Sequence, residues 1–432
     1  MLYFSTNGKA SKTDFKEATI RGQAPDKGLY FPEQIPSLPK DFIENISELS
    51  KEEIAYTVIR PYMGNTVPEK ELKKIIEETV NFEFPLVPIT SSIYSLELFH
   101  GPTLAFKDVG ARFMSRCLGY FVKNNDKKLT VLVATSGDTG GAVANGFYDV
   151  DGVDVVILYP SGKVSSIQEL QLTTLGKNIT ALEVDGSFDD CQQMVKSAFM
   201  DAELNEKLFL TSANSINVAR WLPQQFYYFF AYQQWKNKQE PPVIAVPSGN
   251  FGNICAGLLA YRSGLPVQHF IAACNANDSV VQYLLDGNYQ SKKAVHTISN
   301  AMDVGDPSNF IRILQLFEHD FYSVKNILSS YSISDKETKE TIEHVYSDYQ
   351  YLLDPHGAVG YLALARYLED HINQKGFFLE TAHPVKFYDV VEPIIQQNVT
   401  LPVNVQPLLN KKKQSIQIQA DNTQLKEYLL AK

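Results

Sequence analysis

The chain contains few of the residues that form disulfides and metal sites. Its 432 residues include eight histidines and only four cysteines, Cys117, Cys191, Cys255 and Cys274. The cysteines lie far apart, without a Cys-x-x-Cys pair or zinc-type spacing, and no two histidines are spaced as metal ligands. We therefore expect no disulfide framework and no metal, with the cysteines packed as small apolar side chains in a reducing cytoplasm.

Long apolar runs and an excess of positive charge are also absent. Residues 1–9 become polar too early for a secretory signal, and no apolar run approaches a membrane span. With 39 Lys and Arg against 49 Asp and Glu, the formal net charge of −10 argues against nonspecific nucleic-acid binding. The 44% hydrophobic and 20% charged residues suit a globular protein of two or three domains. We expect a cytoplasmic protein without a membrane or nucleic-acid partner.

One segment places a lysine where a strand gives way to a helix. Residues 93–99 alternate like a strand, and His100, Gly101 and Pro102 interrupt that pattern. From Phe106 onward, apolar residues recur at helical spacing, with Lys107 beside this stripe near the helix start. The helix dipole and nearby apolar groups would both lower the pKa of Lys107 and make its amine a nucleophile able to form a Schiff base. A solvated lysine in the first helical turn is the alternative.

Short apolar strands and amphipathic helices alternate through most of the chain. Strands are predicted at 129–134, 153–159, 179–184, 243–246 and 269–273. This order predicts an α/β fold with parallel sheets, and a ligand cleft between two α/β units. We expect a helical N-terminal unit (1–95), an α/β domain with the lysine (96–220) and a second α/β domain (221–432).

Two helices are predicted in the N-terminal unit. Ser50 with Glu53 forms a possible capping box for the first, which Pro61 should stop. Thr66 with Glu69 marks the start of the second. Both are interpreted as packing helices without a catalytic role.

A glycine-rich turn follows the strand at 243–246. The sequence Pro-Ser-Gly-Asn-Phe-Gly-Asn at 247–253 opens a helix, so its backbone N–H groups and the positive helix end suit a phosphate. A purely steric turn is the alternative. The turn lacks the Gly-Lys-Ser/Thr sequence that holds a nucleotide's outer phosphates, so an ATPase is not indicated.

A second turn of this kind, Thr-Ser-Gly-Asp-Thr-Gly, occupies 135–140 after the strand at 129–134. Its hydroxyl and N–H groups could clasp a carboxylate. The alternative is an ordinary N-capped helix, with Ser136 or Asp138 as the cap.

Cationic and amide side chains near predicted strand ends and the lysine helix could line the cleft. Ordinary surface charges are the alternative for each of them. The candidates are Arg112, Lys163, Asn214, Asn217 and Arg220. His356 and His383 lie beside turn residues and could also line a pocket, although core or loop packing is the simpler interpretation.

Taken together, these stretches resemble the threonine synthase family, which has the pyridoxal-phosphate fold of the tryptophan synthase β-subunit. The resemblance rests on several motifs in the family's order: His-Gly-Pro-Thr-Leu-Ala-Phe-Lys-Asp (100–108), Ala-Thr-Ser-Gly-Asp-Thr-Gly (134–140), Asn-Ser-Ile-Asn (214–217), Pro-Ser-Gly-Asn-Phe-Gly (247–252), Ser-Asn-Ala-Met-Asp-Val (299–304) and Thr-Ala-His-Pro (381–384). The long N-terminal unit resembles the bacterial and fungal branch.

The resemblance assigns roles residue by residue. It implies that Lys107 holds pyridoxal 5′-phosphate as a Schiff base and that Thr381 faces the pyridine nitrogen. Asp138 stands where many relatives on this fold place Asn near the cofactor's 3′ oxygen. The phosphate cradle would be Gly249, Asn250, Phe251, Gly252 and Asn253. The expected substrate-binding residues are Arg112, Thr135, Ser136, Thr139, Lys163, Asn214, Asn217 and Arg220.

The activity implied is a lyase of threonine biosynthesis. It would convert O-phospho-L-homoserine and water into L-threonine and phosphate by β,γ-elimination and replacement. The substrate phosphate requires a second cationic pocket, for which Arg112, Lys163 and Arg220 are candidates. The alternatives are a phospho-lyase, a serine/threonine dehydratase-like enzyme, and a silent cofactor-binding protein. We expect a monomer, although no motif determines the oligomeric state.

Overall fold

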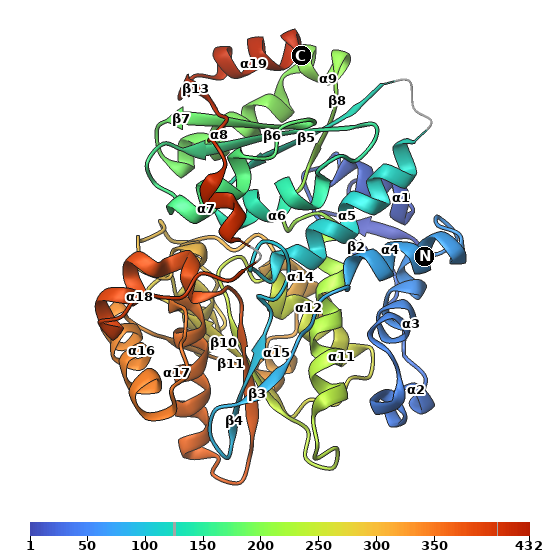
Figure 1. Cartoon of the computed structure of the whole chain (residues 1–432). Helices are drawn as coiled ribbons and strands as arrows, with labels where there is room; N and C mark the ends of the chain where they lie inside the picture. Colours follow the sequence, from blue (N-terminus) through green and yellow to red (C-terminus); the bar gives the residue numbers. More distant parts are fainter. Residues whose placement is uncertain (124–126, 404) are drawn as a thin grey trace.

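The computed structural model describes residues 1–123, 127–403 and 405–432, and it contains two large β-sheets (Figure 1). The upper sheet in Figure 1 is parallel throughout and has the order β13 (Ile416–Gln419), β7 (Ile179–Asp185), β6 (Val153–Pro160), β5 (Leu129–Ala134) and β8 (Phe209–Ser212). The lower sheet has the order β11 (Leu328–Ser332), β10 (His269–Cys274), β9 (Val243–Pro247), β12 (Gly376–Glu380), β4 (Ile93–Glu97) and β3 (Leu86–Pro88). Only β3 runs antiparallel to its neighbour in this sheet.

Helices surround both sheets. Those of the upper half are α5 (Lys107–Val122), α6 (Asp138–Phe147), α7 (Ser166–Thr173), α8 (Phe188–Met200), α9 (Ala202–Lys207) and α19 (Asn422–Ala431). The lower half contains α11 (Gln225–Gln234), α12 (Gly252–Arg262), α13 (Ser279–Asp286), α14 (Phe310–Leu316), α15 (Phe321–Ile327), α16 (Asp335–Tyr349), α17 (Pro355–Asp370) and α18 (Tyr388–Ile395). The short helix α10 (Val218–Trp221) precedes α11, and the 3₁₀ turns are η1 (Ile46–Glu48), η2 (Leu222–Gln224), η3 (Asn300–Met302), η4 (Pro384–Phe387) and η5 (Gln406–Asn410).

The N-terminal unit packs onto both halves. It contains α1 (Phe15–Arg21), α2 (Lys40–Glu44), α3 (Lys51–Met63), α4 (Glu69–Thr79) and the antiparallel pair β1 (Tyr3–Ser5) and β2 (Tyr30–Pro32). Phe15 lies edge-on to Phe113 of α5, which in turn meets Phe226 of α11. These rings belong to one continuous apolar core, so burial of shared surface fixes the unit to the α/β body. The predicted α/β fold with a helical N-terminal unit is confirmed.

The sheets do not follow the expected chain boundaries. β3 lies before residue 95 and β4 spans it, yet both strands pair within the lower sheet. β13 comes from the chain's end, yet it pairs with β7 of the upper sheet. Strand pairing between distant segments is set by tertiary contacts, which local sequence patterns do not encode.

Two details of the N-terminal helices also differ from expectation. Ser50 and Glu53 form the predicted capping box, but Pro61 lies inside α3, which continues to Met63. Burial of Tyr62 and Met63 offsets the one backbone hydrogen bond that a proline removes. Thr66 does not cap α4, because its hydroxyl donates to the carbonyl oxygen of Met63 at 2.7 Å.

None of the helices in the described residues has the length and apolarity needed to cross a membrane.

Candidate active site

The lysine segment is bound to the ends of two neighbouring strands. β4, β12 and β9 are adjacent and parallel, so their carboxyl ends lie at the same edge of the sheet. The backbone N–H of Leu98 donates to the carbonyl oxygen of Glu380 at 3.0 Å, and that of Phe106 donates to Thr381 at 2.8 Å. Because β12 also pairs with β9, Thr381 and the 247–253 turn follow neighbouring strands.

Lys107 is the first residue of α5 and is half-buried. Burial lowers the pKa of its amine from 10.5 to about 8; Asp138 opposes this shift, and the like charges of Lys386 and Arg220 add to it. The amino group lies 5.8 Å from the centre of the Phe106 ring. A substantial fraction of the amine is therefore neutral near pH 8, which is the state in which it acts as a nucleophile or a base.

The 247–253 turn offers a row of backbone N–H groups. Phe251 adopts a left-handed conformation with φ of 60°, immediately before α12 begins at Gly252. The N–H groups of residues 249–253 have no acceptor among the described residues, and most of this segment is buried. Free N–H groups at the start of an eleven-residue helix fit a phosphate.

The asparagine side chains of this turn hold its shape. Asn253 donates to the carbonyl oxygen of Pro247 at 2.7 Å, and Asn250 donates to the hydroxyl of Ser215 at 2.8 Å. A Cβ atom at Gly249 would lie 2.5 Å from the Cα atom of Met302, so only glycine fits without a shift of the backbone. The side chains thus support the turn, and its N–H groups are left for a ligand.

Thr381 presents a free hydroxyl beside this turn. Its side chain is buried, and its Oγ1 atom has no hydrogen-bond partner among the described residues. The preceding Glu380 is fully buried, and burial followed by the nearby Asp354 raises the pKa of its carboxyl well above the usual value. The residue directly after β12 therefore offers a neutral hydroxyl and not a carboxylate.

The 135–140 turn contains three hydroxyl groups, of which one shapes the turn and two are free to bind a ligand. Thr135 Oγ1 accepts hydrogen bonds from the N–H groups of Gly137 at 2.9 Å and Gly140 at 2.7 Å. Gly137 has a φ of 135°, a conformation that favours glycine. The hydroxyls of Ser136 and Thr139 are partly exposed and have no partner among the described residues. Thr135 thus shapes the turn, while Ser136 and Thr139 remain free to bind.

Asp138 forms a buried ion pair that the sequence did not reveal. Its Oδ1 atom lies 2.8 Å from Nζ of Lys386 and accepts a hydrogen bond from Gln168 at 2.9 Å. Burial alone would raise the pKa of this carboxyl, but Lys386 and Lys107 hold it well below its usual range. Lys386 belongs to η4, so the pair joins the two halves of the molecule. Its only sequence signal was its place five residues after Thr381.

Two of the predicted substrate residues have their side chains bound to backbone elsewhere. The Arg112 guanidinium donates to the carbonyl oxygen of Glu78 and, at 3.1 Å, to the side chain of Asn81. The Asn217 amide donates to the carbonyl oxygen of Thr19 at 2.8 Å, and its oxygen caps α10. Both side chains connect the N-terminal unit to the α/β body.

The other three candidates differ in burial. Arg220 is buried and donates to the carbonyl oxygen of Ala213 at 2.7 Å, and burial lowers the pKa of its guanidinium to about 10. Its Nε atom has no partner among the described residues. Lys163 is exposed and Asn214 partly exposed, and neither side chain has a hydrogen bond within the described part of the chain.

The two histidines considered from sequence support loops. The buried His356 places Nδ1 2.5 Å from Oδ1 of Asp354, and its Nε2 accepts from the N–H of Ala301 at 3.2 Å. His383 caps η4, and burial lowers the pKa of its ring to about 4. Within the described residues, no three His, Cys, Asp or Glu side chains gather as a metal site would require.

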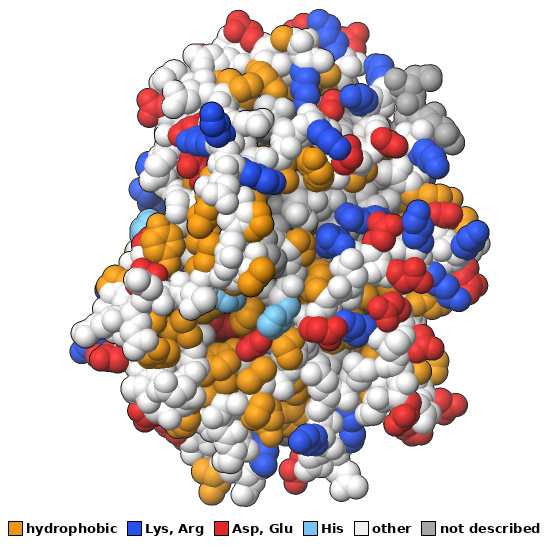
Figure 2. All heavy atoms as spheres, viewed as in Figure 1, with side chains coloured by type: hydrophobic (Ala, Val, Ile, Leu, Met, Phe, Trp, Pro, Cys, Tyr) orange, Lys and Arg blue, Asp and Glu red, His pale blue; other side chains and the backbone are white. Residues whose placement is uncertain are grey.

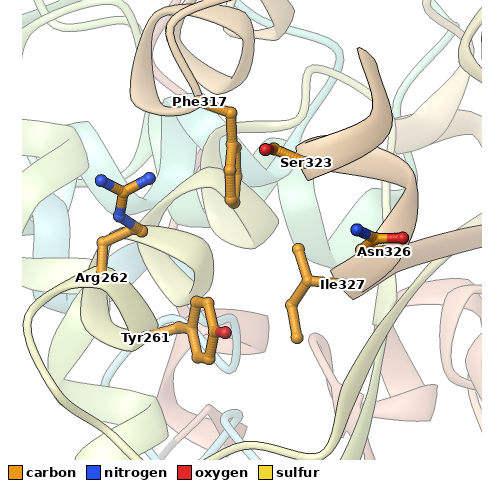
Figure 3. Close-up of a pocket in the computed structure, with 6 residues that line it drawn as sticks. All are labelled: Tyr261, Arg262, Phe317, Ser323, Asn326 and Ile327. Carbon is orange, nitrogen blue, oxygen red and sulfur yellow. The ribbon is translucent and has the colours of Figure 1, made fainter. Parts of the chain in front are cut away.

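A pocket of about 370 Å³ lies elsewhere on the molecule (Figure 3). Arg262 donates to the carbonyl oxygen of Leu316 at 3.0 Å and covers the Phe317 ring. The pocket is lined by residues of α12 and α15 and by the residue after α14, and none of them belongs to the lysine site. The lining residues are Tyr261, Arg262, Phe317, Ser323, Asn326 and Ile327.

Three family models match this chain. The profile "Pyridoxal-phosphate dependent enzyme" matches residues 85–376, "Threonine synthase N terminus" matches 2–80 and "Threonine synthase, C-terminal" matches 357–429. Threonine synthase from Haemophilus influenzae is 43% identical over 436 residues, which cover both chains completely.

Solved structures agree with this match. The crystal structure of threonine synthase from Escherichia coli superposes with a TM-score of 0.91 at 39% identity and covers both chains completely. The pyridoxal-phosphate-bound threonine synthase from Brucella melitensis superposes with a TM-score of 0.93 at 34% identity, covering 99% of this chain and 98% of that one. The chain therefore belongs to the threonine synthase family of pyridoxal-phosphate-dependent enzymes.

Proposed function

We propose that this chain converts O-phospho-L-homoserine and water into L-threonine and phosphate, the last step of threonine biosynthesis. The observation that carries the proposal is the juxtaposition at the sheet edge. Lys107, with its lowered pKa, directly follows Phe106, whose N–H donates to Thr381. Thr381 follows β12, and the free N–H groups of 249–253 follow the neighbouring strand β9. Membership of the threonine synthase family supports this reaction.

The residues at this edge fit pyridoxal 5′-phosphate. The N–H groups of 249–253 and the dipole of α12 would hold its phosphate, and the Lys107 amine would hold its carbonyl carbon. The Thr381 hydroxyl would face its pyridine nitrogen, and it carries no negative charge that would keep that nitrogen protonated. When bound, the cofactor withdraws electrons from the carbons next to the substrate's amino group, so that their protons can be removed.

Lys107 is the base in this proposal. With a pKa of about 8, its amine can accept the proton from the substrate's Cα and then a proton from Cβ, and it can return protons to carbon. Phosphate leaves from Cγ, the hydroxyl of a water molecule adds at Cβ, and one proton is returned to Cγ and one to Cα, which gives threonine. A lysine with its ordinary pKa of 10.5 would be almost fully protonated at neutral pH and would serve poorly as a base.

The substrate's carboxylate and phosphate need separate sites. The free hydroxyls of Ser136 and Thr139, at the start of α6, suit the carboxylate. For the phosphate we retain Lys163 and Arg220 as candidates, and Asn214 stays a candidate for substrate binding. Because the side chains of Arg112 and Asn217 bind backbone carbonyl groups of the N-terminal unit, we assign both of them to structural support.

Product analysis tests this function directly. The purified chain would be incubated with pyridoxal phosphate and O-phospho-L-homoserine and followed by proton and phosphorus NMR. Threonine and phosphate in equal amounts are expected. Phosphate with 2-oxobutyrate would instead support the phospho-lyase alternative, and a fully loaded protein without turnover would contradict both.

We further propose that the chain acts as a monomer in the cytoplasm, without a nucleic-acid or membrane partner. All four cysteines are buried free thiols, as suits a reducing compartment. On the face shown in Figure 2, acidic side chains are interspersed among the basic ones rather than separated from them. Light scattering of the purified protein would give the oligomeric state, and a dimer mass would contradict the first part of this proposal.

A further inference from the structure

Lys386 is a charged side chain without any exposed surface. A lysine is rarely buried in this way unless partners compensate its lost hydration. Its Nζ atom lies 2.8 Å from Oδ1 of Asp138 and donates to the carbonyl oxygen of Thr103 at 2.8 Å. One partner belongs to α6 of the upper half, and the other belongs to the turn that leads into Lys107.

Thr103 extends this contact to the helix that carries Lys107. Its carbonyl oxygen also accepts a hydrogen bond from Gln171 of α7 at 3.1 Å. Its N–H and hydroxyl donate to the two oxygens of Asp108, at 2.9 and 2.5 Å. Lys386 thus connects η4, α6, α7 and the first turn of α5 through one buried network.

We propose that Lys386 is a positioning residue for Lys107. By pairing with Asp138, it keeps that carboxylate from pairing with the Lys107 ammonium, and it fixes the 135–140 turn to the turn before Lys107. The inference rests on the proposed function only in taking Lys107 as the reactive amine.

The charged groups that face Lys107 come from three other elements. Asp138 of α6 favours its ammonium form, whereas Lys386 of η4 and Arg220 of α10 disfavour it. Asp108, next to Lys107 in α5, directs its oxygens to Thr103 instead, and burial raises the pKa of its carboxyl. The Tyr227 hydroxyl of α11 donates to the carbonyl oxygen of Phe106, and burial raises the pKa of that phenol well above 10.

Opposite shifts of the Lys107 pKa are therefore expected from the two partners. Lys386→Met removes a like charge and frees Asp138 to pair with Lys107, so the pKa of Lys107 should rise. Asp138→Asn removes the one favourable charge, so that pKa should fall. Each unit of rise lowers the neutral fraction of the amine at pH 7 about tenfold. The double variant should return toward the wild-type pKa.

The measurement uses the cofactor-free full-length protein. The rate of pyridoxal-phosphate incorporation is followed by visible absorbance across a pH series, and borohydride reduction with peptide mapping locates the modified lysine at Lys107. At pH 7 the rate should fall about tenfold or more in Lys386→Met, while Lys386→Arg, which keeps the charge, should stay near wild type. Lys426→Met is the matched control, because Lys426 pairs with Asp201, the N-cap of α9, and with Glu203 in α9.

If Lys386 served only folding, the pKa of Lys107 would shift in the same direction in both single variants or would stay unchanged. Either result overturns the proposal. If Lys386→Met does not fold, the comparison of Asp138→Asn with Asp138→Asn/Lys386→Met remains. In Asp138→Asn the Lys386 charge still lowers the pKa of Lys107, so that pKa must be higher in the double variant, which lacks this charge. An equal pKa in the two variants overturns the proposal. This test follows cofactor incorporation at Lys107 and not threonine formation. It therefore stays valid for a protein that binds the cofactor at Lys107 but makes another product.

Discussion

The backbone N–H of Phe106 donates to the carbonyl oxygen of Thr381 at 2.8 Å, across 275 residues of chain. This bond fixes the residue before the reactive lysine to the residue that we assign to the cofactor ring. The neighbouring bond from His383 N–H to the carbonyl oxygen of Leu104, at 3.0 Å, reinforces it. The lysine and the ring site are thus held at a constant separation by main-chain contacts, which substitutions of side chains leave intact.

Lys107→Ala should abolish turnover. Because Lys107 is proposed to hold the cofactor and move the substrate protons, kcat should fall by at least about 10²- to 10⁴-fold, the range for loss of a positioned base. Threonine formation measured by NMR checks this. Lys426→Met, at a surface ion pair, should retain wild-type kcat; comparable activity in both variants would remove Lys107 from the mechanism.

The lowered pKa of Lys107 should appear in the stability of the cofactor-free protein. Between about pH 8 and 10.5 the unfolded chain binds more protons at this lysine than the folded chain, so stability rises with pH in that window. Lys107→Met removes the penalty, and should stabilise the fold by roughly 3 kcal/mol at pH 7 and by little at pH 10.5.

Urea unfolding of both proteins at the two pH values measures the difference. An equal gain in unfolding free energy at pH 7 and pH 10.5 would mean that packing of the methionine, and not the charge of Lys107, is responsible.

Gly249→Ala should weaken cofactor binding. Its new methyl group would lie 2.5 Å from Met302 Cα, so the backbone that presents the N–H groups must shift. We expect a loss of about tenfold or more in affinity for pyridoxal phosphate, equivalent to about 1.4 kcal/mol. Fluorescence titration checks it.

Gly162→Ala is the matched control for Gly249→Ala. It has a φ of 65° and no atom within 4 Å of the new methyl group, so it should cost about 1 kcal/mol of stability and no affinity. Equal losses of affinity in both variants would show that backbone stiffness is responsible and not the cradle.

Thr381→Val should lower kcat up to about tenfold, because one hydrogen bond contributes about 0.5–1.5 kcal/mol. Thr381→Ser keeps the hydroxyl and should stay close to wild type. Steady-state kinetics with the loaded enzyme distinguishes them, and equal rates would mean that the hydroxyl has no partner in the reaction.

Asp354→Ala should destabilise the fold by about 3 kcal/mol, because its buried carboxylate accepts from the N–H groups of His356 at 2.8 Å and Gly357 at 3.2 Å. Ser334→Ala, an exposed helix cap, should cost only about 1 kcal/mol. Thermal unfolding compares them, and similar losses would show that burial of Asp354 adds nothing to its capping.

Local features of the chain could be predicted well. The strand at 129–134 has the predicted bounds, and Ser50 with Glu53 forms the predicted capping box. The turns at 135–140 and 247–253 follow strands and open helices as expected. All of these depend on side chains within a few residues of each other, which is the range over which sequence patterns act.

The sequence by itself therefore determined the α/β class, the order of strands and turns, and the lysine at the start of a helix. Only the tertiary structure decided that β13 joins the upper sheet, that Arg112 and Asn217 bind the N-terminal unit, and that Lys386 pairs with Asp138. Lys386 stands between Val385 and Phe387, and no local pattern of this kind shows whether a single lysine is solvated or buried. Whether it is buried, and beside which carboxylate, depends on how distant segments pack, and that packing sets the charge at the reactive amine.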